Sequence, residues 1–225
     1  MGNNKLTLFD FCETLIKFQT ADKYVEFCRE HLLTKRMRKV HQFTVMLEKL
    51  RFFKAYNRIK KGNNLHKRLI LWQLKGIDKS TCELMAKQYF EEMLLPNVIP
   101  DTINLLRKHQ EQGDDVWIIS GGYDIYIKCF VDYFKINGFI SSKIGFSATQ
   151  KCTGKMEGPD CMRDNKIPLL EERFGRNPDQ LVITFYTDSR SDLPLLQAVQ
   201  HPYVISKKTH QKWIDNYNFK EIIWI

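Results

Sequence analysis

The sequence LFDFCETL at residues 8–15 is the most informative stretch of the chain. The apolar run from Leu6 to Phe9 is typical of a β-strand, and the carboxylate of Asp10 follows it directly. In open α/β sheets, ligands bind beyond the carboxyl ends of the strands. Asp10 is therefore a candidate functional residue, although one aspartate after a strand is also an ordinary turn former or helix cap.

Further apolar segments of strand length follow, and helical patterns separate them. These segments are residues 116–119, 181–186, 203–205 and 221–225. Most are continuous rather than alternating, as expected for strands that are covered on both faces. Helical patterns run from Pro100 to a stop at Gly113, over residues 167–174 and from Ser191 to Val199. The order predicts an α/β fold, a Rossmann-like doubly wound parallel sheet.

The long interval between the first two strands breaks this alternation. Residues 20–95 carry only helical signals, which predicts an inserted helical cap domain at residues 18–95 within a core of residues 1–17 and 96–225. Ser80 to Glu83 form a capping-box pattern that predicts a helix start. Residues 60–64, Lys-Lys-Gly-Asn-Asn, predict a break between two helices.

Composition restricts the class of protein. The 225 residues are 43% hydrophobic and 27% charged, which is typical of a soluble globular protein. No apolar run reaches the roughly 18 residues that a membrane-spanning helix needs, and the N-terminus has no secretory signal pattern. The six cysteines form no CxxC pair, so we expect reduced thiols and a cytoplasmic location.

The net charge of +9 is concentrated in one segment. Residues 29–68 contain thirteen Lys or Arg against Glu30 and Glu48, a local balance of +11. Such a block is usually a solvated helical surface; otherwise it serves an anionic partner such as a phosphorylated substrate, a membrane surface or nucleic acid. We hypothesise that the block surrounds the site entrance. Candidates there for reading a second anionic group are Arg51, Arg58, Lys67 and Arg68.

Other polar clusters adjoin the predicted strands. Ser120-Gly121-Gly122 follows the second strand, Asp188 and Asp192 follow the third, and Lys166 begins the helix before it. Each alone has an ordinary explanation as a turn, a cap or a surface charge. Together they suit phosphoryl transfer: two carboxylates can hold Mg²⁺, while a hydroxyl, amides and an ammonium neutralise phosphate oxygens. A carboxylate in line with phosphorus can act as nucleophile.

These clusters resemble the four motifs of the haloacid dehalogenase (HAD) superfamily. LFDFCETL resembles the first motif, a strand followed by Asp, any residue, Asp, any residue and Thr. Residues 120–122 resemble the second, Lys166 the third, and YTDSRSDLPL at residues 186–195 the fourth. The insertion between motifs one and two resembles the phosphoserine-phosphatase-like branch, which includes phosphatidylglycerophosphatase C type proteins.

The resemblance implies a role for each matching residue. Asp10 would be the nucleophile and a Mg²⁺ ligand, with the backbone carbonyl of Cys12 and the carboxylate of Asp188 as further ligands. Asp192 would be a supporting acidic residue, with a helix N-terminal charge as its ordinary alternative. The remaining matches would bind phosphate: Ser120, the amide of Gly121, Lys166 and Thr14, the last also steadying the first loop.

One position departs from the pattern. Cys12 stands where the superfamily usually has its second motif-one Asp, the general acid and base. A thiol, with a reference pKa near 8.5, can donate a proton but accepts one poorly, and losing such a group typically costs about 10² to 10⁴ in rate. Glu13 is an unpromising substitute, because neighbours in an extended segment point to opposite sides. Cys12 is alternatively a small packed residue beside an intact nucleophile.

Three functions follow from this sequence. The first is a Mg²⁺-dependent phosphatase that hydrolyses a phosphomonoester, either a small phosphorylated metabolite or a phospholipid headgroup, through an aspartyl-phosphate on Asp10. The second is a phosphotransferase or slow enzyme, favoured by Cys12. The third is a non-catalytic phosphate-ligand-binding protein, supported only by the basic segment. We expect no specific nucleic acid partner. Peripheral contact with a membrane through the basic cap is a further option.

Overall fold

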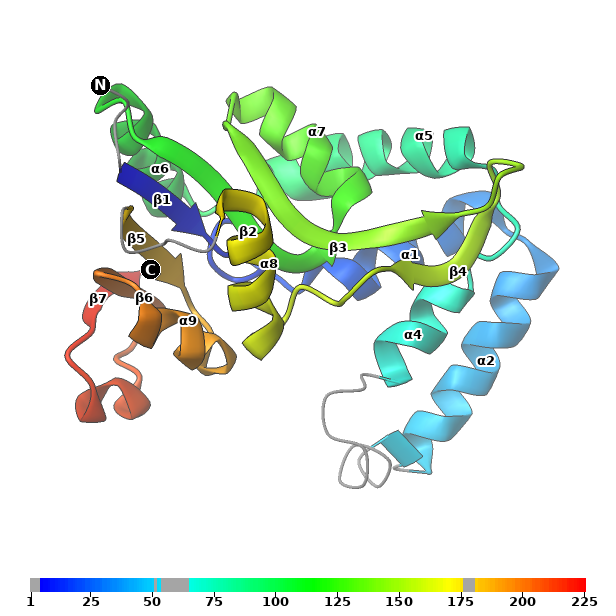
Figure 1. The fold of residues 1–225 in the computed structure, drawn as a ribbon. Coiled ribbons are helices and arrows are strands. Elements are labelled where there is room, and N and C mark those ends of the chain that lie inside the picture. Colours follow the sequence, from blue (N-terminus) through cyan, green and yellow to red (C-terminus); the bar gives the residue numbers. More distant parts are fainter. Residues whose placement is uncertain (1–4, 51, 54–64, 176–180) are drawn as a thin grey trace.

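The computed structural model describes residues 5–50, 52–53, 65–175 and 181–225. Its strands form one seven-stranded sheet in the order β4-β3-β2-β1-β5-β6-β7 (Figure 1). All neighbouring pairs are parallel except β3 and β4, which are antiparallel. The strands are β1 (Lys5–Phe9), β2 (Asp115–Tyr123), β3 (Gly138–Phe146), β4 (Cys152–Glu157), β5 (Val182–Thr187), β6 (His201–Lys207) and β7 (Lys220–Trp224). The predicted α/β fold is confirmed.

Two strands were not predicted, and both lie at one edge of the sheet. β3 places Ser141, Ser142 and Lys143 in its centre, so it has no continuous apolar run. β4 contains Gly154 at φ 72° and the charged residues Lys155 and Glu157. β4 lies at the edge of the sheet and pairs with β3, and an edge strand commonly contains charged residues. Polar residues thus interrupt the apolar pattern by which a strand is predicted in both β3 and β4.

Helices cover both faces of the sheet. Successive sheet residues alternate between two cores: Phe9 and Ile118 pack in one, Leu8 and Ile119 in the other. Helices α6 (Pro100–Glu111) and α7 (Asp124–Phe134) contribute to the first core, and α8 (Lys166–Phe174) and α9 (Leu193–Ala198) to the second. A short 3₁₀ turn, η5 (Arg190–Asp192), precedes α9. This arrangement is the predicted doubly wound layering.

In the described residues, the segment between β1 and β2 consists of helices joined by turns and isolated bridges, without a strand. It contains α1 (Thr20–Leu32), α2 (Lys35–Lys49), α4 (Leu65–Trp72), α5 (Lys79–Tyr89) and a π-helical turn, η1 (Phe90–Leu94). We call α1, α2, α4 and α5 the inserted helices. Helices α2 and α4 contact each other and extend away from the sheet (Figure 1). No described helix has both the length and the apolar character to cross a membrane.

One boundary prediction in this segment was wrong. The capping box at Ser80 does not form, because α5 already begins at Lys79 after Asp78, and no side chain caps it. The backbone N–H of Lys79 bonds instead to the carbonyl of Gln150, which joins this turn to the loop before β4. The predicted break at residues 60–64 lies outside the described residues.

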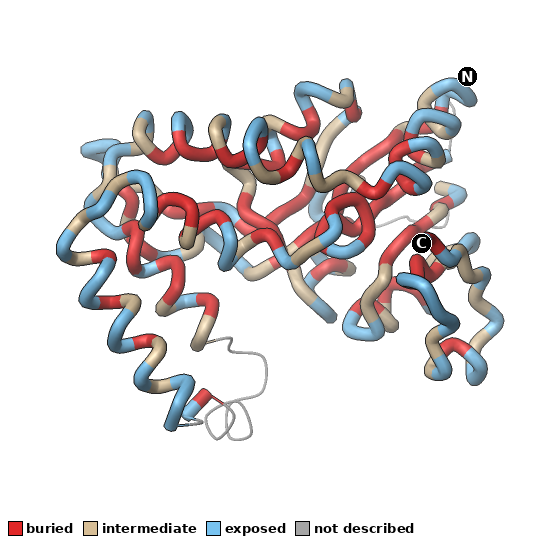
Figure 2. The backbone as a smooth tube through the Cα atoms, turned by 180° about the vertical axis from the view of Figure 1, so that it is seen from behind, coloured by how far each residue is buried: buried red, intermediate tan, exposed pale blue. Residues whose placement is uncertain are grey.

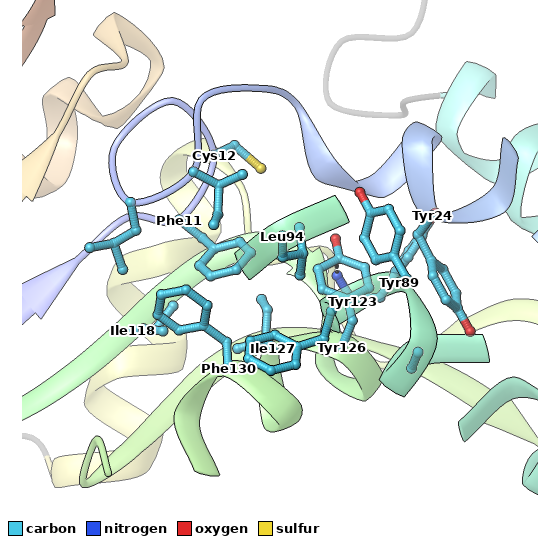
Figure 3. Packing of buried hydrophobic residues seen from close by; sticks show 14 of the residues in the cluster. Phe11, Cys12, Tyr24, Tyr89, Leu94, Ile118, Tyr123, Tyr126, Ile127 and Phe130 are labelled. Carbon is cyan, nitrogen blue, oxygen red and sulfur yellow. Dashed lines mark hydrogen bonds between the residues drawn. The ribbon is translucent and has the colours of Figure 1, made fainter. Parts of the chain in front are cut away.

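Four buried tyrosines join the inserted helices to the sheet. Tyr24 of α1 and Tyr89 of α5 pack against Tyr126 of α7, with ring centroids 5.3 and 5.4 Å apart, and Tyr123 at the end of β2 completes the group (Figure 3). Such tilted and edge-to-face pairs are favourable beyond the area that they bury. The cluster fixes α1 against the sheet, and the sulfur of Cys12 lies at its edge (Figure 3).

Candidate active site

The predicted site residues meet at the carboxyl ends of β1, β2 and β5. Phe9 is in register with Ile118 and with Tyr186, so the residues that follow these strands lie side by side. They form the floor of a cleft of about 240 Å³. The predicted residues that line it are Asp10, Cys12, Ser120, Gly121, Lys166, Asp188 and Asp192.

Lys166 holds two carboxylates together on the floor. Its Nζ donates to Asp10 Oδ1 at 2.9 Å and to Asp192 Oδ2 at 2.6 Å, and its side chain is 2% exposed. Burial opposes the ammonium charge, but Asp10 and Asp192 outweigh this and raise the pKa of Lys166. Thr187 also donates to Asp192, at 2.7 Å. Asp192 occupies the N-cap position of α9 without a side-chain capping bond, so its contacts are those of a residue that positions Lys166.

Asp188 differs because nothing cationic neutralises it. In the part of the chain that the structure describes, its carboxylate forms no ion pair, and its one side-chain partner is Thr14, which donates to Oδ1 at 3.1 Å. Burial, then the charges of Asp10 and Glu13, raises its pKa to about 8. A buried carboxylate without a counter-charge is unfavourable, and a bound cation would remove that penalty.

The donor set fits Mg²⁺. Asp10 and Asp188 line the cleft and offer hard carboxylate oxygens, the ligand chemistry that Mg²⁺ prefers, and the family resemblance adds the backbone carbonyl of Cys12. Within the described ranges, no three His, Cys, Asp or Glu side chains form a metal cage. The predicted set does not require one, since it uses two side chains and one carbonyl.

Thr14 does not lie where a phosphate-binding residue must lie. Its side chain is fully buried and does not line the cleft. Its hydroxyl donates to Asp188 and accepts from the backbone N–H of Asp188 at 2.9 Å. The predicted phosphate contact is therefore corrected: Thr14 links the first loop to Asp188, as the predicted steadying role requires.

The loop of Ser120 and Gly121 is closely packed. The Ser120 hydroxyl accepts from the Gly122 backbone at 3.3 Å, which orients it. A Cβ on Gly121 would lie 2.4 Å from Met162 Cγ, so a larger residue would displace that side chain. Lys67 of α4 donates to the Gly121 carbonyl at 2.6 Å. An inserted helix thus holds the loop that would contact phosphate.

Lys67 is the buried residue whose role the sequence did not reveal. Its ammonium also pairs with Asp160 at 2.5 Å and lies 3.3 Å from the Ser142 hydroxyl, and the side chain is 5% exposed. Lys67 lines the cleft with its ammonium paired to Asp160, so its part in binding a second anionic group stays a prediction. Arg51 and Arg58 lie outside the described residues, and Arg68 is exposed away from the cleft.

Cys12 lies in the cleft as a neutral thiol. Its Sγ is 3.1 Å from the Thr20 hydroxyl, accepts from the Thr20 backbone at 3.4 Å, and is only 9% exposed as a residue. Burial, then the charge of Asp10, raises the pKa of Cys12 to about 12. The thiol therefore neither releases nor accepts a proton readily near neutral pH. Glu13, at φ 55°, is exposed, accepts from Gln19 and does not line this cleft.

The inserted helices form the opposite wall of the cleft, which we call the roof. It contains Gln19 and Asp22 from the start of α1 and His66 and Lys67 from α4. Of the described residues between 29 and 68, only His66 and Lys67 line the cleft. None of these residues follows a strand, and of the four only Lys67 was named from the sequence as a candidate at the site.

The family is established by comparison with known proteins. A family model described as haloacid dehalogenase-like hydrolase matches residues 7–197, and the chain belongs to this family. The expectation of a HAD-like hydrolase is thereby confirmed.

Three individual relatives illustrate the likeness. A histidinol-phosphatase from Neisseria meningitidis serogroup C (strain 8013) is 26% identical over 144 residues, 60% of this chain and 65% of the relative, so the match spans slightly less than two thirds of that protein. A protein of unknown function from Bordetella pertussis Tohama I shares the fold with a TM-score of 0.80 at 17% identity, over 97% of both chains. A phosphoserine phosphatase in its apo form matches with a TM-score of 0.58 at 18% identity, over 90% of this chain and 86% of that one.

Proposed function

We propose that this protein is a Mg²⁺-dependent phosphatase that hydrolyses a phosphomonoester through an aspartyl-phosphate on Asp10. The observation that carries the proposal is the arrangement of charges on the cleft floor. Asp10 is held by Lys166 while Asp188, beside it, lacks a counter-charge. A floor with one fixed ammonium and one uncompensated carboxylate suits a phosphate accompanied by a divalent cation.

The residues of the floor would divide the chemistry between them. An Asp10 oxygen attacks phosphorus, the bond from phosphorus to the leaving oxygen breaks, and that oxygen takes up a proton. Water then attacks phosphorus, the bond to Asp10 breaks, and inorganic phosphate leaves. Lys166, Ser120 and the Gly121 amide would stabilise the phosphate oxygens. Mg²⁺, held by Asp10, Asp188 and the Cys12 carbonyl, would supply further positive charge at the phosphate.

The size of the cleft and the curated relative support a small substrate. The cleft of about 240 Å³ accommodates a compact phosphorylated metabolite. The relative of known activity is a histidinol-phosphatase, and a structural neighbour is a phosphoserine phosphatase. We therefore place small phosphorylated alcohols, histidinol phosphate and phosphoserine among them, first in a substrate panel, with phospholipid headgroups next.

The experiment is phosphate release from this panel with and without Mg²⁺. We expect activity with Mg²⁺, its loss in EDTA, and its loss in Asp10→Asn, whose fold is checked by circular dichroism. Magnesium-dependent release that persists in Asp10→Asn would overturn the assignment of Asp10.

A phosphotransferase or slow enzyme is the second candidate, and the buried Cys12 thiol favours it. A group that cannot accept a proton would leave the aspartyl-phosphate long-lived. Accumulation of phosphoenzyme in the steady state, with transfer to added alcohols faster than to water, would select this candidate over a phosphatase.

We propose that residues 18–95 act as a cap over the cleft, and that the exposed side of α2 contacts anionic membrane surfaces. Much of the tube of α2 is exposed (Figure 2). Phe43, Met46 and Leu50 are about half exposed or more and recur at helical spacing, and Lys35 and Lys39 are exposed on the same helix. Apolar and basic side chains together suit an anionic bilayer surface. Flotation with phosphatidylglycerol vesicles should exceed that with phosphatidylcholine vesicles and fall in Phe43→Ser. Equal recovery of the protein with both kinds of vesicle would reject the contact.

The free thiols of the six cysteines support a cytoplasmic location.

A further inference from the structure

The two-step reaction needs a proton donor and acceptor that Cys12 does not supply. The side chain at position 12 is a buried thiol bonded to the hydroxyl and backbone N–H of Thr20, where the family usually has a carboxylate. The other ionisable residues of the floor are already used, since Lys166 binds Asp10 and Asp192 and Asp188 faces the expected cation. On the roof, Lys67 is neutralised by Asp160. The carboxyl and imidazole groups that remain along the described cleft wall are those of Asp22 and His66.

Asp22 lines the same cleft as Cys12. It is in the first turn of α1, two residues after Thr20, whose hydroxyl is 3.1 Å from the Cys12 thiol. Asp22 lines the same cleft as Asp10, and its side chain is 50% exposed, so the carboxyl group is accessible to a bound substrate. The tyrosine cluster that contains Tyr24 and Tyr126 fixes this turn against the sheet.

His66 connects Asp22 to a second carboxylate. Its Nδ1 is 3.5 Å from Asp22 Oδ2, and its Nε2 is 2.6 Å from Glu48 Oε1. The row therefore runs from Glu48 on α2, through the imidazole on α4, to Asp22 on α1. An imidazole bonded to one carboxylate can orient and stabilise the charge of another, as a base is oriented by a third group in many hydrolases.

The groups around Asp22 affect the pKa of its carboxyl in both directions, and the net effect is to raise it. Burial raises its pKa, against the opposing effects of His66 and Lys67, and Glu48 and Glu26 raise it further. These residues come from α4, α2 and α1, the helices that surround the side chain. A carboxyl group whose pKa lies closer to neutrality is a better proton donor and acceptor in this pH range.

Resting on the proposed phosphatase activity, we propose that Asp22 performs the proton transfers usually made by the second motif-one Asp, with His66 and Glu48 positioning it. In the first step the Asp22 carboxyl gives its proton to the leaving oxygen, which departs as an alcohol. In the second step the resulting carboxylate takes a proton from the water that attacks phosphorus. Asp22 thus returns to its initial state, and no further reactant is consumed.

The test uses substrates that differ in their need for a proton. A p-nitrophenyl leaving group departs without protonation, whereas an alkyl alcohol such as that of glycerol 2-phosphate requires it. We expect Asp22→Asn to lower kcat/KM at least about 100-fold on glycerol 2-phosphate and less than about fivefold on p-nitrophenyl phosphate. The matched control is Glu30→Gln, which removes an exposed carboxylate about two turns along α1 that lies outside the cleft and should leave both rates unchanged.

Two further variants separate proton transfer from binding. His66→Gln should show the same leaving-group dependence as Asp22→Asn with a smaller loss, since it acts through Asp22. Adding Cys12→Asp to Asp22→Asn should raise kcat/KM on glycerol 2-phosphate at least tenfold above that of Asp22→Asn, because it places a carboxylate at the usual position.

An equal loss on both substrates, or a rise in KM alone, would show that Asp22 binds substrate and would overturn the proposal. A protein without Mg²⁺-dependent, Asp10-dependent hydrolysis of p-nitrophenyl phosphate would instead overturn the proposed function, so the two failures are distinguishable.

Discussion

The floor and the roof of the cleft are built in different ways. The floor lies at the carboxyl ends of β1, β2 and β5, where the register of the parallel strands brings its residues together, and Lys166 joins them from the start of α8. The roof consists of Gln19, Asp22, His66 and Lys67, which reach the cleft only because the inserted helices pack against the sheet through the tyrosine cluster. The floor fixes the type of chemistry, while the roof, in our account, supplies the proton and admits the substrate.

Each wall contains one buried lysine, and their partners differ. Lys166 joins Asp10 and Asp192, both at the reacting centre. Lys67 joins Asp160 to the Gly121 carbonyl and so supports the phosphate loop from behind. The two buried ammonium groups therefore have different roles: that of Lys166 takes part in the chemistry, and that of Lys67 supports the structure of the site.

The largest expected effect comes from Lys166→Met. Removing the ammonium leaves two buried carboxylates unpaired, which should destabilise the fold by about 3–5 kcal/mol. Loss of positive charge at the phosphate should also lower kcat by about 10²–10³ where the protein stays folded. Urea denaturation and phosphate release measure the two effects.

Lys67→Met is the matched change on the roof. It should lower the free energy of unfolding by about 1–3 kcal/mol, since Asp160 is partly exposed to water. It should reduce kcat by less than about tenfold. An equal loss of turnover in the two variants would remove the distinction between chemistry and scaffold.

Asp188→Asn should stabilise the protein in the absence of metal. The pKa of Asp188 is raised from 3.8 to about 8, so the native state holds this proton more tightly than the unfolded state. Stability is therefore lost as pH rises between these values, and an amide avoids the loss. In EDTA at pH 8 we expect a gain on the order of 2 kcal/mol, and little change at pH 4.

Magnesium provides the control for Asp188→Asn. It should stabilise the parent protein against urea and leave the variant unchanged. A variant that is less stable than the parent in EDTA at pH 8 would show that Asp188 is compensated without a cation.

The smallest expected effect is that of salt on a small substrate. The basic segment of residues 29–68 was expected to surround the entrance. Of its described residues, Lys35, Arg38 and Lys39 are exposed along α2 and do not line the cleft, whereas Lys67 does. We expect a change of less than about threefold between 0.05 and 0.5 M salt, because charges beyond roughly 10 Å are screened. A tenfold or larger fall in kcat/KM over this range would show that the basic segment does lie at the entrance.

The sequence predicted the floor well because strand ends converge wherever the strands are parallel neighbours. The order Asp10, Ser120, Lys166, Asp188 was sufficient to place these residues together. β3 and β4 escaped prediction because polar residues interrupt their apolar pattern. The contacts of Lys67 and of the Glu48–His66–Asp22 row depend on how three helices pack, which local spacing along the chain does not encode. Thr14 was assigned to the right loop but to the wrong partner.

A covalent bond between Asp10 and phosphorus can be tested directly by locating that bond. The protein is mixed with p-nitrophenyl phosphate and Mg²⁺, quenched in acid within one turnover, reduced with borohydride and digested. Reduction converts an aspartyl-phosphate to homoserine, so mass spectrometry of the peptide that contains Asp10 should show homoserine at position 10. Asp10→Asn should show none. Homoserine at another aspartate, or an unmodified Asp10 while phosphate is released at the parent rate, would contradict the account.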